Sequence, residues 1–342
     1  MKNVLFVSLG CDKNLVDSEK MLGLLNEAGY RVAQEESEAD AIVVNTCCFI
    51  HDAKEESVET ILEMAEWKKK DRLKALIVTG CMAQRYQDEI QQEIPEVDAV
   101  IGTTGYTEIV PILDEILAEA EASQKEAAVE EPKEKSFVNC CPSIDLLPAS
   151  LADKRVVTTG GYTAYLKIAE GCNKRCTYCI IPYIRGHYRS FPMEDLLEEA
   201  RKLAEGGVKE LILIAQETTV YGMDCYGRKA LPELLTKLCE IEGIEWIRIL
   251  YCYPEEITDE LIAVMKKEKK ICHYLDIPIQ HSEDTILKRM GRRTNRAELV
   301  SLVEKLRKEI PDIVLRTTLI TGFPGETEEE FKNMVDFVDS ME

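Results

Sequence analysis

Three cysteines lie in one short segment, EGCNKRCTYCIIPYIRG, at Cys172, Cys176 and Cys179, with the spacing Cys-x3-Cys-x2-Cys. Cysteine thiolates are the usual ligands of iron–sulfur clusters, and a cubane cluster contains four irons. Three cysteines leave one iron open to bind another molecule, whereas a cluster that only carries electrons normally takes four. The triplet therefore predicts an iron–sulfur site that performs catalysis.

A structural zinc site is the alternative for the same triplet, with His187 as a fourth ligand. Zinc sites usually contain paired Cys-x2-Cys arms, or cysteine and histidine at closer spacing. Only Cys176 and Cys179 have that gap here. The spacing favours the iron–sulfur interpretation.

Three further cysteines each end a short run rich in Val, Ile and Leu: VLFVSLGC at Cys11, AIVVNTC at Cys47 and ALIVTGC at Cys81. Such runs are typical of strands that are buried on both faces. Helical patterns over residues 14–29 and 52–70 separate the runs, which predicts a parallel sheet with crossover helices. Ligands of such sheets gather at the carboxyl ends of the strands. We therefore expect these cysteines to meet at one edge, where they could hold a second cluster with an open iron.

Burial without any function is the alternative for each of these cysteines, because cysteine is also a small core residue. Chance burial has no reason to select the same position at three strand ends. Cys48 directly follows Cys47, and alternation along a strand sends neighbouring side chains to opposite faces. We expect Cys47 to be the ligand. Cys140 and Cys141 lack the strand-end placement and are not expected to be ligands.

The composition changes between the two halves of the chain. Residues 119–155 contain EAEASQKEAAVEEPKEK, which is acidic, low in large apolar residues and interrupted by Pro132, as expected of an exposed linker. We therefore predict an N-terminal α/β domain over residues 1–118 and a second domain over residues 156–342.

Strand and helix patterns alternate again in the second domain, with strands near AYLKIAE, ELILIAQ, WIRILYCYP, YLDIPIQ and VLRTTLITG. This order predicts five strands of a βα barrel, in which functional groups come from the carboxyl ends of the strands. Cys172 lies at the first of these ends, and the others carry Gln216, Tyr253, Gln280 and Gly322. The run KRMGRR at residues 288–293 predicts a solvated helix end.

The triplet Cys172, Cys176 and Cys179 resembles the signature of the radical S-adenosylmethionine (SAM) enzymes, including the aromatic Tyr178 before the last cysteine. A strand-end triplet followed by this one resembles the methylthiotransferases of that superfamily, over essentially the whole chain. Within them the chain is similar to the branch that methylthiolates the β-carbon of an aspartate in small-subunit ribosomal protein twelve. The matching runs are SLGCDKNLVDSEKMLG, NTCCFIHDAKEES, TGCMAQRY, IRGHYRSFPMED, IAQETTVYGMDCYG, PIQHSEDTILKRMGR and LRTTLITGFPGETEEEF.

This resemblance implies two [4Fe–4S] clusters and SAM as cofactors. It implies an auxiliary cluster on Cys11, Cys47 and Cys81 and a radical cluster on Cys172, Cys176 and Cys179. One SAM molecule would methylate a sulfur at the auxiliary cluster, and another would yield the radical that removes hydrogen from the aspartate. SAM would lie near Tyr178, Gly322 and Gly325, although a GFPG run is also typical of a tight turn. The scheme requires no acid or base side chain, and we name none.

The chain departs from the family pattern in three places. Cys48 stands where the family usually has Gly, and Asp12 stands where it commonly has Pro. The chain also ends at Glu342, before the sixth barrel strand and the small RNA-binding-type β-barrel that the family carries. The resemblance therefore implies a barrel that is incomplete at its C-terminal side.

The charge balance bears on the partner. The chain has 342 residues and 63 acidic against 42 basic side chains, which gives a net charge of −21. Proteins that bind nucleic acid neutralise phosphates with Lys and Arg, so we do not expect direct binding of nucleic acid. An acidic surface instead steers a basic ribosomal protein toward the enzyme. The resemblance adds a low-potential electron donor, such as a flavodoxin or ferredoxin, as a second partner.

Other functions remain as alternatives. The same chemistry on a tRNA adenosine is the enzymatic alternative. A two-cluster electron carrier and a zinc-stabilised binding module are the non-enzymatic ones. Thirteen cysteines without paired spacing indicate a reducing compartment, and no stretch approaches the roughly 18 apolar residues of a membrane span. We expect a cytoplasmic protein that does not bind membranes.

Overall fold

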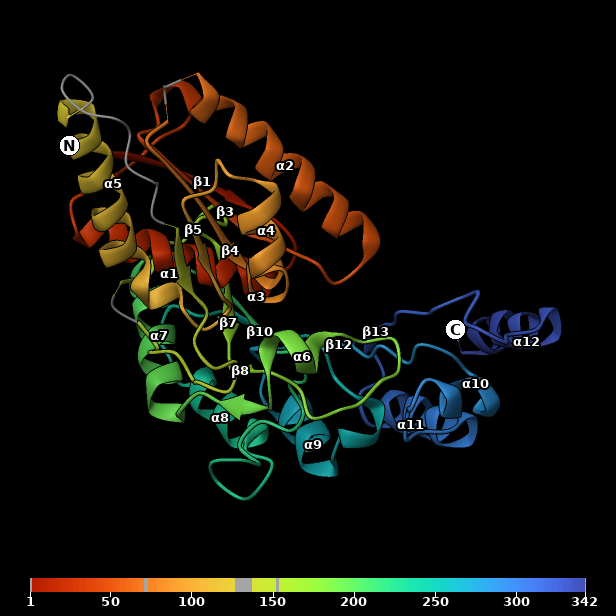
Figure 1. Cartoon of the computed structure of the whole chain (residues 1–342). Coiled ribbons are helices and arrows are strands. Elements are labelled where there is room, and N and C mark those ends of the chain that lie inside the picture. Colours follow the sequence, from red (N-terminus) through yellow and green to blue (C-terminus); the bar gives the residue numbers. More distant parts are fainter. Residues whose placement is uncertain (1, 71–72, 127–136, 152–153, 342) are drawn as a thin grey trace. The chain divides into compact units, whose positions relative to one another are not determined.

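The computed structural model describes residues 2–70, 73–126, 137–151 and 154–341. The chain forms two compact units (Figure 1). The first consists of Met1–Thr158 with Tyr183–Gly186, and the second of Thr159–Pro182 with His187–Glu342. The short segment Tyr183–Gly186 thus belongs to the first unit, although its neighbours in sequence belong to the second.

The first unit contains a six-stranded sheet in the order β2-β1-β3-β4-β5-β6, and all of its pairs are parallel. The strands are β1 (Asn3–Ser8), β2 (Arg31–Val32), β3 (Ala41–Thr46), β4 (Ala75–Gly80), β5 (Ala99–Ile101) and β6 (Val138–Cys140). Every residue of β3 and β4 is buried. This burial explains why both strands are almost continuously apolar in sequence.

Helices cover both faces of this sheet (Figure 1). They are α1 (Asp12–Glu27), α2 (His51–Lys69), α3 (Cys81–Arg85), α4 (Gln87–Glu93) and α5 (Ile109–Glu126). Met21 of α1 and Leu113 of α5 share a core cluster with Val43 and Ile77 of the sheet. α2 packs against β3 and β4 and buries Ile61 there. The predicted parallel sheet with crossover helices is confirmed.

Residues 119–155 were predicted to be a linker, but the first unit extends through Thr158 and includes regular elements from this range. α5 continues through Glu126, and Asn139 of β6 lies opposite Val100 of β5. Residues 127–136, which include Pro132, and residues 152–153 lie outside the described residues. The exposed face of an amphipathic helix has the same acidic composition as a linker, so composition alone could not separate the two.

The second unit contains a five-stranded parallel sheet in the order β13-β12-β11-β10-β7. Its strands are β7 (Thr163–Lys167), β10 (Glu210–Ile214), β11 (Trp246–Ile249), β12 (Ile271–Asp276) and β13 (Val314–Arg316). β8 (Ala169–Glu170) and β9 (Arg189–Ser190) form a separate antiparallel pair. The five predicted strands are confirmed, and β7 and β13 are the two edges of the described sheet.

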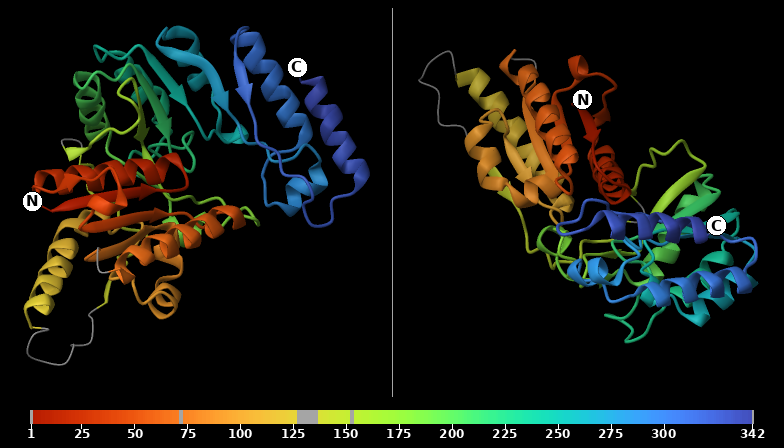
Figure 2. Two further views of the ribbon diagram at one scale, coloured as in Figure 1. Left: turned by 90° about the horizontal axis from the view of Figure 1, so that it is seen from above. Right: turned by 90° about the vertical axis from the view of Figure 1, so that its right-hand side faces the viewer.

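The helices of this unit connect the strands. They are α6 (Ile181–Arg185), α7 (Met193–Glu205), α8 (Leu231–Cys239), α9 (Asp259–Lys267), α10 (Asp284–Arg289), α11 (Arg296–Glu309) and α12 (Glu328–Ser340), with the last residues of α6 counted in the first unit. α12 lies beside α11 (Figure 2), where the Arg296 guanidinium is 5.0 Å from the centre of the Phe337 ring. Capping boxes begin both helices. Within the described ranges, no helix has the length and apolar character needed to cross a lipid bilayer.

Candidate metal centres

Cys11, Cys47 and Cys81 follow the carboxyl ends of β1, β3 and β4. The strands are in register there, with Ser8 opposite Asn45 and Thr46 opposite Gly80. Burial raises the pKa of the Cys47 thiol, and raises that of Cys81 to about 12. The charge of Cys11 adds to both rises, and that of Cys47 adds to the rise at Cys81. The structure therefore brings these three thiols within electrostatic range of one another.

Two glycines permit this approach. Gly10 and Gly80, each the residue before a cysteine, have φ values of 88° and 92°. A Cβ at Gly10 would lie 2.6 Å from the Cβ of Cys47, and one at Gly80 would lie 2.2 Å from Oδ1 of Asn45. Both the left-handed backbone and the lack of space require glycine at these positions.

Polar groups of α1 hold the strand ends in place. Asn14 Nδ2 donates to the carbonyl oxygens of Leu9 (3.0 Å) and Thr46 (2.9 Å). Asn45 Nδ2 donates to the carbonyl oxygen of Asn14 (2.8 Å). Oδ1 of Asn14 lies 3.8 Å from the Cys81 sulfur. Asn14 carries no functional signal in the sequence, because a polar residue in a helical pattern usually faces solvent.

Cys48 lies close to the site, but its thiol contacts the main chain. Its Sγ donates to the carbonyl oxygen of Cys81 (3.3 Å). Cys47 is instead held through its backbone, since its amide donates to the Ser57 hydroxyl (3.0 Å) and that hydroxyl donates to its carbonyl (2.9 Å). Cys140 belongs to β6, and the Cys141 sulfur is 4.0 Å from the carbonyl oxygen of Ala83.

Cys172, Cys176 and Cys179 lie in the loop between β8 and α6 of the second unit. The amide of Lys174 donates to the Cys172 sulfur (3.4 Å), and the amide of Cys179 donates to the Cys176 carbonyl (3.1 Å). Burial is the main cause that raises the pKa of Cys172 to about 12, and the charges of Glu217 and the other two cysteines add to it. These three thiols also lie within electrostatic range of one another.

Aromatic and basic side chains surround this loop. The hydroxyl of Tyr253 is 3.3 Å from the Cys176 sulfur. The Arg292 guanidinium lies 4.1 Å, and the Lys174 ammonium 4.8 Å, from the centre of the Tyr253 ring. Burial, with an added contribution from Cys176, raises the pKa of Tyr178. Arg292 is only 8% exposed, so the predicted solvated end at KRMGRR is wrong for this residue, which stacks on the aromatic ring.

A cavity of about 360 Å³ adjoins Cys172 and is also lined by Tyr188 and Glu217. The Tyr188 hydroxyl and Oε2 of Glu217 are buried there without a hydrogen-bond partner among the described residues. The same holds for both polar atoms of the Gln216 amide, next to Glu217 in sequence. Burial raises the pKa of Glu217 to about 7. Buried polar groups in folded proteins are normally hydrogen-bonded, so these atoms are open to a water molecule, an ion or a bound polar ligand.

The GFPGE run forms the loop between β13 and α12, where Gly322 and Gly325 have φ values of 72° and 84°. Arg289 Nη1 donates to the carbonyl oxygen of Gly325 (2.6 Å). The backbone of Arg289 and Met290 in turn accepts hydrogen bonds from Thr177, which lies between Cys176 and Cys179. Arg289 thus links the glycine loop to the cysteine loop.

The zinc alternative requires His187 beside Cys172, Cys176 and Cys179. In the part of the chain that the structure describes, no three His, Cys, Asp or Glu residues are placed to hold one metal ion. His187, the candidate fourth ligand, is exposed. A cluster makes a different demand, because each cysteine binds a different iron and the sulfurs can lie further apart.

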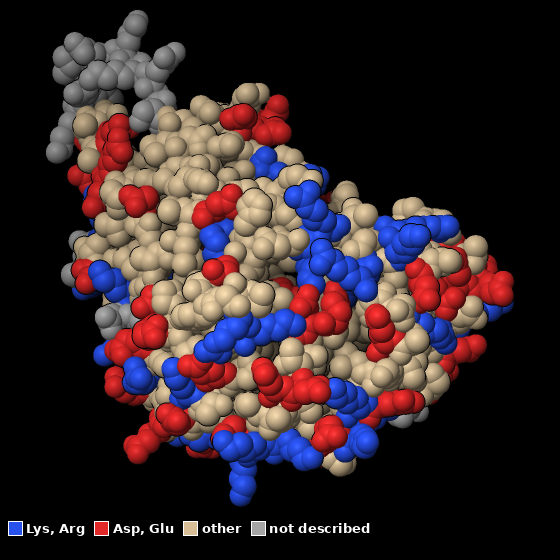
Figure 3. Space-filling model, turned by 90° about the horizontal axis from the view of Figure 1, so that it is seen from below, with Lys and Arg blue, Asp and Glu red and all other residues tan. Residues whose placement is uncertain are grey.

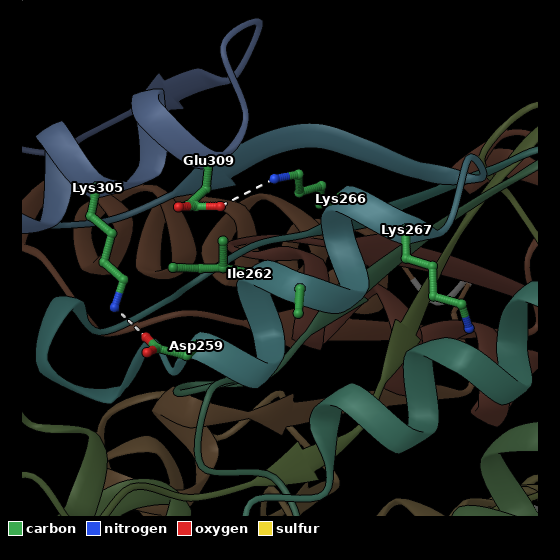
Figure 4. A pocket seen from close by; sticks show the side chains of 7 residues that line it. Asp259, Ile262, Lys266, Lys267, Lys305 and Glu309 are labelled. Carbon is green, nitrogen blue, oxygen red and sulfur yellow. Dashed lines mark hydrogen bonds and ion pairs between the residues drawn. The ribbon is translucent and has the colours of Figure 1, made fainter.

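A second hollow in this unit lies between α9 and α11 (Figure 4). Lys266 pairs there with Glu309 (3.2 Å), and Lys305 pairs with Asp259. The two charges of each pair neutralise each other, and the residues that line the hollow include none of the predicted site residues. We assign it no role.

Two family models match the chain. Residues 3–102 match the model described as Uncharacterized protein family UPF0004, and residues 166–338 match the Radical SAM superfamily. The second match begins within β7 and contains the other four strands of the parallel sheet and the cysteine loop of the second unit. Fold and site together define a radical SAM enzyme.

Curated relatives specify the family. The ribosomal protein uS12 methylthiotransferase RimO of Lachnoclostridium phytofermentans is 65% identical over 99% of this chain and 73% of its own length. Those of Clostridioides difficile and Acetivibrio thermocellus are 50% and 53% identical, over 100% and 98% of this chain and 73% and 72% of their own lengths. The chain belongs to the RimO family of ribosomal protein uS12 methylthiotransferases.

Solved structures show the same fold. The radical SAM methyltransferase TsrM from Kitasatospora setae, with cobalamin and a [4Fe–4S] cluster bound, matches with a TM-score of 0.66, covering 100% of this chain and 73% of that chain. The cobalamin-dependent SAM radical enzyme OxsB matches with a TM-score of 0.63, covering 98% of this chain and 52% of that chain. The sequence identities are 15% and 13%. The predicted family and fold class, and with them a radical SAM methylthiotransferase that uses SAM and [4Fe–4S] clusters, are confirmed.

Proposed function

We propose that this chain adds a methylthio group to the β-carbon of an aspartate in ribosomal protein uS12. The observation that carries the proposal is its 65% identity with a RimO enzyme over 99% of the chain. The two cysteine triads, one at the strand ends of the first unit and one in the loop between β8 and α6, support it. An enzyme with a ribosomal protein as substrate acts in the cytoplasm, where thirteen cysteines also stay reduced.

Each unit has its own part in this reaction. The first unit, through Thr158, is the domain of the auxiliary cluster, and the second is the radical SAM domain. The ligands of the two clusters are Cys11, Cys47 and Cys81 in the first unit and Cys172, Cys176 and Cys179 in the second. When bound, the radical cluster and SAM supply the one-electron chemistry that removes hydrogen from an unreactive carbon. A low-potential donor such as a flavodoxin or ferredoxin supplies the electron.

The protein's own groups orient these cofactors. The Lys174 amide donates a hydrogen bond to the Cys172 sulfur, and the Tyr253 hydroxyl lies within hydrogen-bond distance of the Cys176 sulfur. Such bonds to ligand sulfurs fix their direction and tune the metal. The unpaired polar atoms of Gln216 and Glu217 offer partners to the polar groups of SAM. Tyr178, Gly322 and Gly325 complete the proposed SAM site, with the glycine loop held by Arg289.

The charge of the chain is in keeping with a basic protein as substrate. Acidic and basic side chains both lie on the face seen in Figure 3, and several basic ones adjoin in its upper right part. With 63 acidic and 42 basic residues the balance is negative. Long-range attraction then favours a basic ribosomal protein over a polyanionic RNA.

The experiment offers both substrates at once. Anaerobically reconstituted protein is incubated with SAM, a strong reductant, uS12 and unmodified tRNA, and both products are read by mass spectrometry. We expect a methylthio mass on one aspartyl peptide of uS12, and about eight irons per chain for two cubane clusters. A methylthio mass on a nucleoside, with unmodified uS12, would instead assign the chain to the tRNA-modifying enzymes. Loss of 5′-deoxyadenosine on replacing Cys172, Cys176 and Cys179 by Ala checks the radical site.

A further inference from the structure

Arg185 is a buried cation in the first unit. It is the last residue of α6 and is 1% exposed. The segment Tyr183–Gly186 docks onto the first unit, where the Thr103 hydroxyl donates to the carbonyl oxygen of Ile184 (2.9 Å). Burying a guanidinium is costly unless neighbouring groups compensate its charge. The position of Arg185 therefore calls for a specific electrostatic reason.

The contacts of Arg185 lead directly to the strand-end cysteines. Its Nη2 donates to Oδ1 of Asn14 (2.6 Å), and the guanidinium pairs with the Asp17 carboxylate (3.3 Å). The same Oδ1 of Asn14 lies 3.8 Å from the Cys81 sulfur. Because Nδ2 of Asn14 is held by the carbonyl oxygens at two strand ends, Oδ1 has a fixed direction. Asn14 Oδ1 thus contacts the guanidinium and lies beside the Cys81 thiol, and the guanidinium itself also reaches that thiol.

Electrostatics point the same way. Arg185 lies within electrostatic range of both Cys47 and Cys81. A positive charge stabilises negative charge more strongly in a buried site than in water, because the surroundings screen it less. Arg185 is thus placed to act on negative charge at this triad.

We propose that Arg185 is a positioning residue of the auxiliary cluster. Arg185 orients the Cys81 thiol through Asn14 and raises the reduction potential of the cluster. Reduction adds one electron, supplied by the low-potential donor, and makes the cluster more negative without breaking a bond. A nearby cation stabilises that reduced form, and net charge and hydrogen bonding are known to set cluster potentials. The inference rests on the proposed function, since it needs a cluster on Cys11, Cys47 and Cys81.

The test isolates this cluster in the full chain. Cys172, Cys176 and Cys179 are all replaced by Ala, so that the reconstituted protein carries the auxiliary cluster alone. The midpoint potential of this cluster is measured by a redox titration in which electron paramagnetic resonance detects the reduced form. In this background we expect Arg185→Met to shift the potential to more negative values, and Arg185→Lys, which keeps the charge, to stay close to the parent.

Arg155→Met is the matched control. The Arg155 side chain is 1% exposed and pairs with Glu19, two positions from Asp17 on the same helix. This variant loses a comparable buried ion pair, which a thermal unfolding curve records, and we expect its potential to stay unchanged. An unchanged potential in Arg185→Met, or an equal shift in Arg155→Met, would overturn the proposal.

Two further outcomes are separable. If Arg185→Met does not retain iron, Arg185→Gln, a neutral variant that can still hydrogen-bond to Asn14, replaces it, and the same negative shift is expected. Failure of both neutral variants to shift the potential refutes the role of the charge. If the triple-alanine background itself binds no iron, the auxiliary cluster of the proposed function fails first, and the inference fails with it.

Discussion

The two cysteine triads are assembled in opposite ways. In the second unit one loop supplies Cys172, Cys176 and Cys179, so a short stretch of sequence contains the whole proposed ligand set. In the first unit the three proposed ligands come from the ends of β1, β3 and β4, which the parallel sheet must bring together. A loop triad depends on local backbone conformation. A strand-end triad depends on the register of the sheet and on the small residues beside it.

The largest expected effect separates the functions of the two triads. Cys176→Ala should abolish both 5′-deoxyadenosine formation and methylthio transfer, because the radical cluster loses a ligand. Cys81→Ala should abolish methylthio transfer to uS12 while 5′-deoxyadenosine still forms. Product analysis and iron content measure both. Cys140→Ala, a cysteine of β6 outside both triads, is the control and should leave both activities intact. Loss of 5′-deoxyadenosine in Cys81→Ala would contradict the separation.

A second prediction tests how strongly the strand-end triad depends on its glycines. Gly80→Ala introduces a side chain at φ 92°, with a Cβ 2.2 Å from Asn45 Oδ1. We expect it to lower the free energy of unfolding by about 4 kcal/mol and to reduce the auxiliary iron. Gly29→Ala, at φ 88° with open space around it, should cost only about 1 kcal/mol. Urea unfolding of both variants decides; equal costs would refute the steric argument.

The third prediction concerns the buried carboxyl group near the loop triad. Burial raises the pKa of Glu217 from 4.5 to about 7, so the folded chain holds this proton more tightly than the unfolded chain. The contribution to stability is complete below pH 4.5 and is lost as the pH rises to about 7. The expected total is about 3 kcal/mol. Unfolding of the unloaded protein across this range measures it.

Glu217→Gln is the control for that titration. It keeps the shape of the side chain but cannot ionise, so its stability should rise relative to the parent as the pH increases from 4.5 to 7. A difference between the two proteins that stays constant with pH would show that Glu217 does not titrate in this range.

The smallest effect is expected at the hydroxyl that lies beside the loop triad. Tyr253→Phe removes the group 3.3 Å from the Cys176 sulfur but keeps the ring on which Arg292 stacks. We expect a loss of about 1 kcal/mol in stability and slower cleavage of SAM with unchanged iron content. Tyr162→Phe, whose residue is 75% exposed, should change neither quantity. Complete loss of iron in Tyr253→Phe would mean that the hydroxyl is required for assembly.

Sequence patterns predicted the regular elements well, because these have short-range signals. Buried strands leave continuous runs of Val, Ile and Leu, and the strands that end near Cys47 and Cys81 occur where those runs predicted them. Prediction failed where composition was ambiguous. The acidic stretch after residue 118 contains the end of α5 and the strand β6, and Arg292 in a basic run is buried against Tyr253.

The sequence by itself determined the family, the five strands of the second unit and the grouping of Cys172, Cys176 and Cys179 in one loop, since residues within one loop need no long-range contact to meet. Only the tertiary structure decided that Asn14 and Arg185 lie beside the strand-end cysteines. These two residues come from distant parts of the chain and carry no spacing signal. Arg185 is buried because the segment Tyr183–Gly186 packs within the first unit, and no local sequence pattern reveals such a long-range contact.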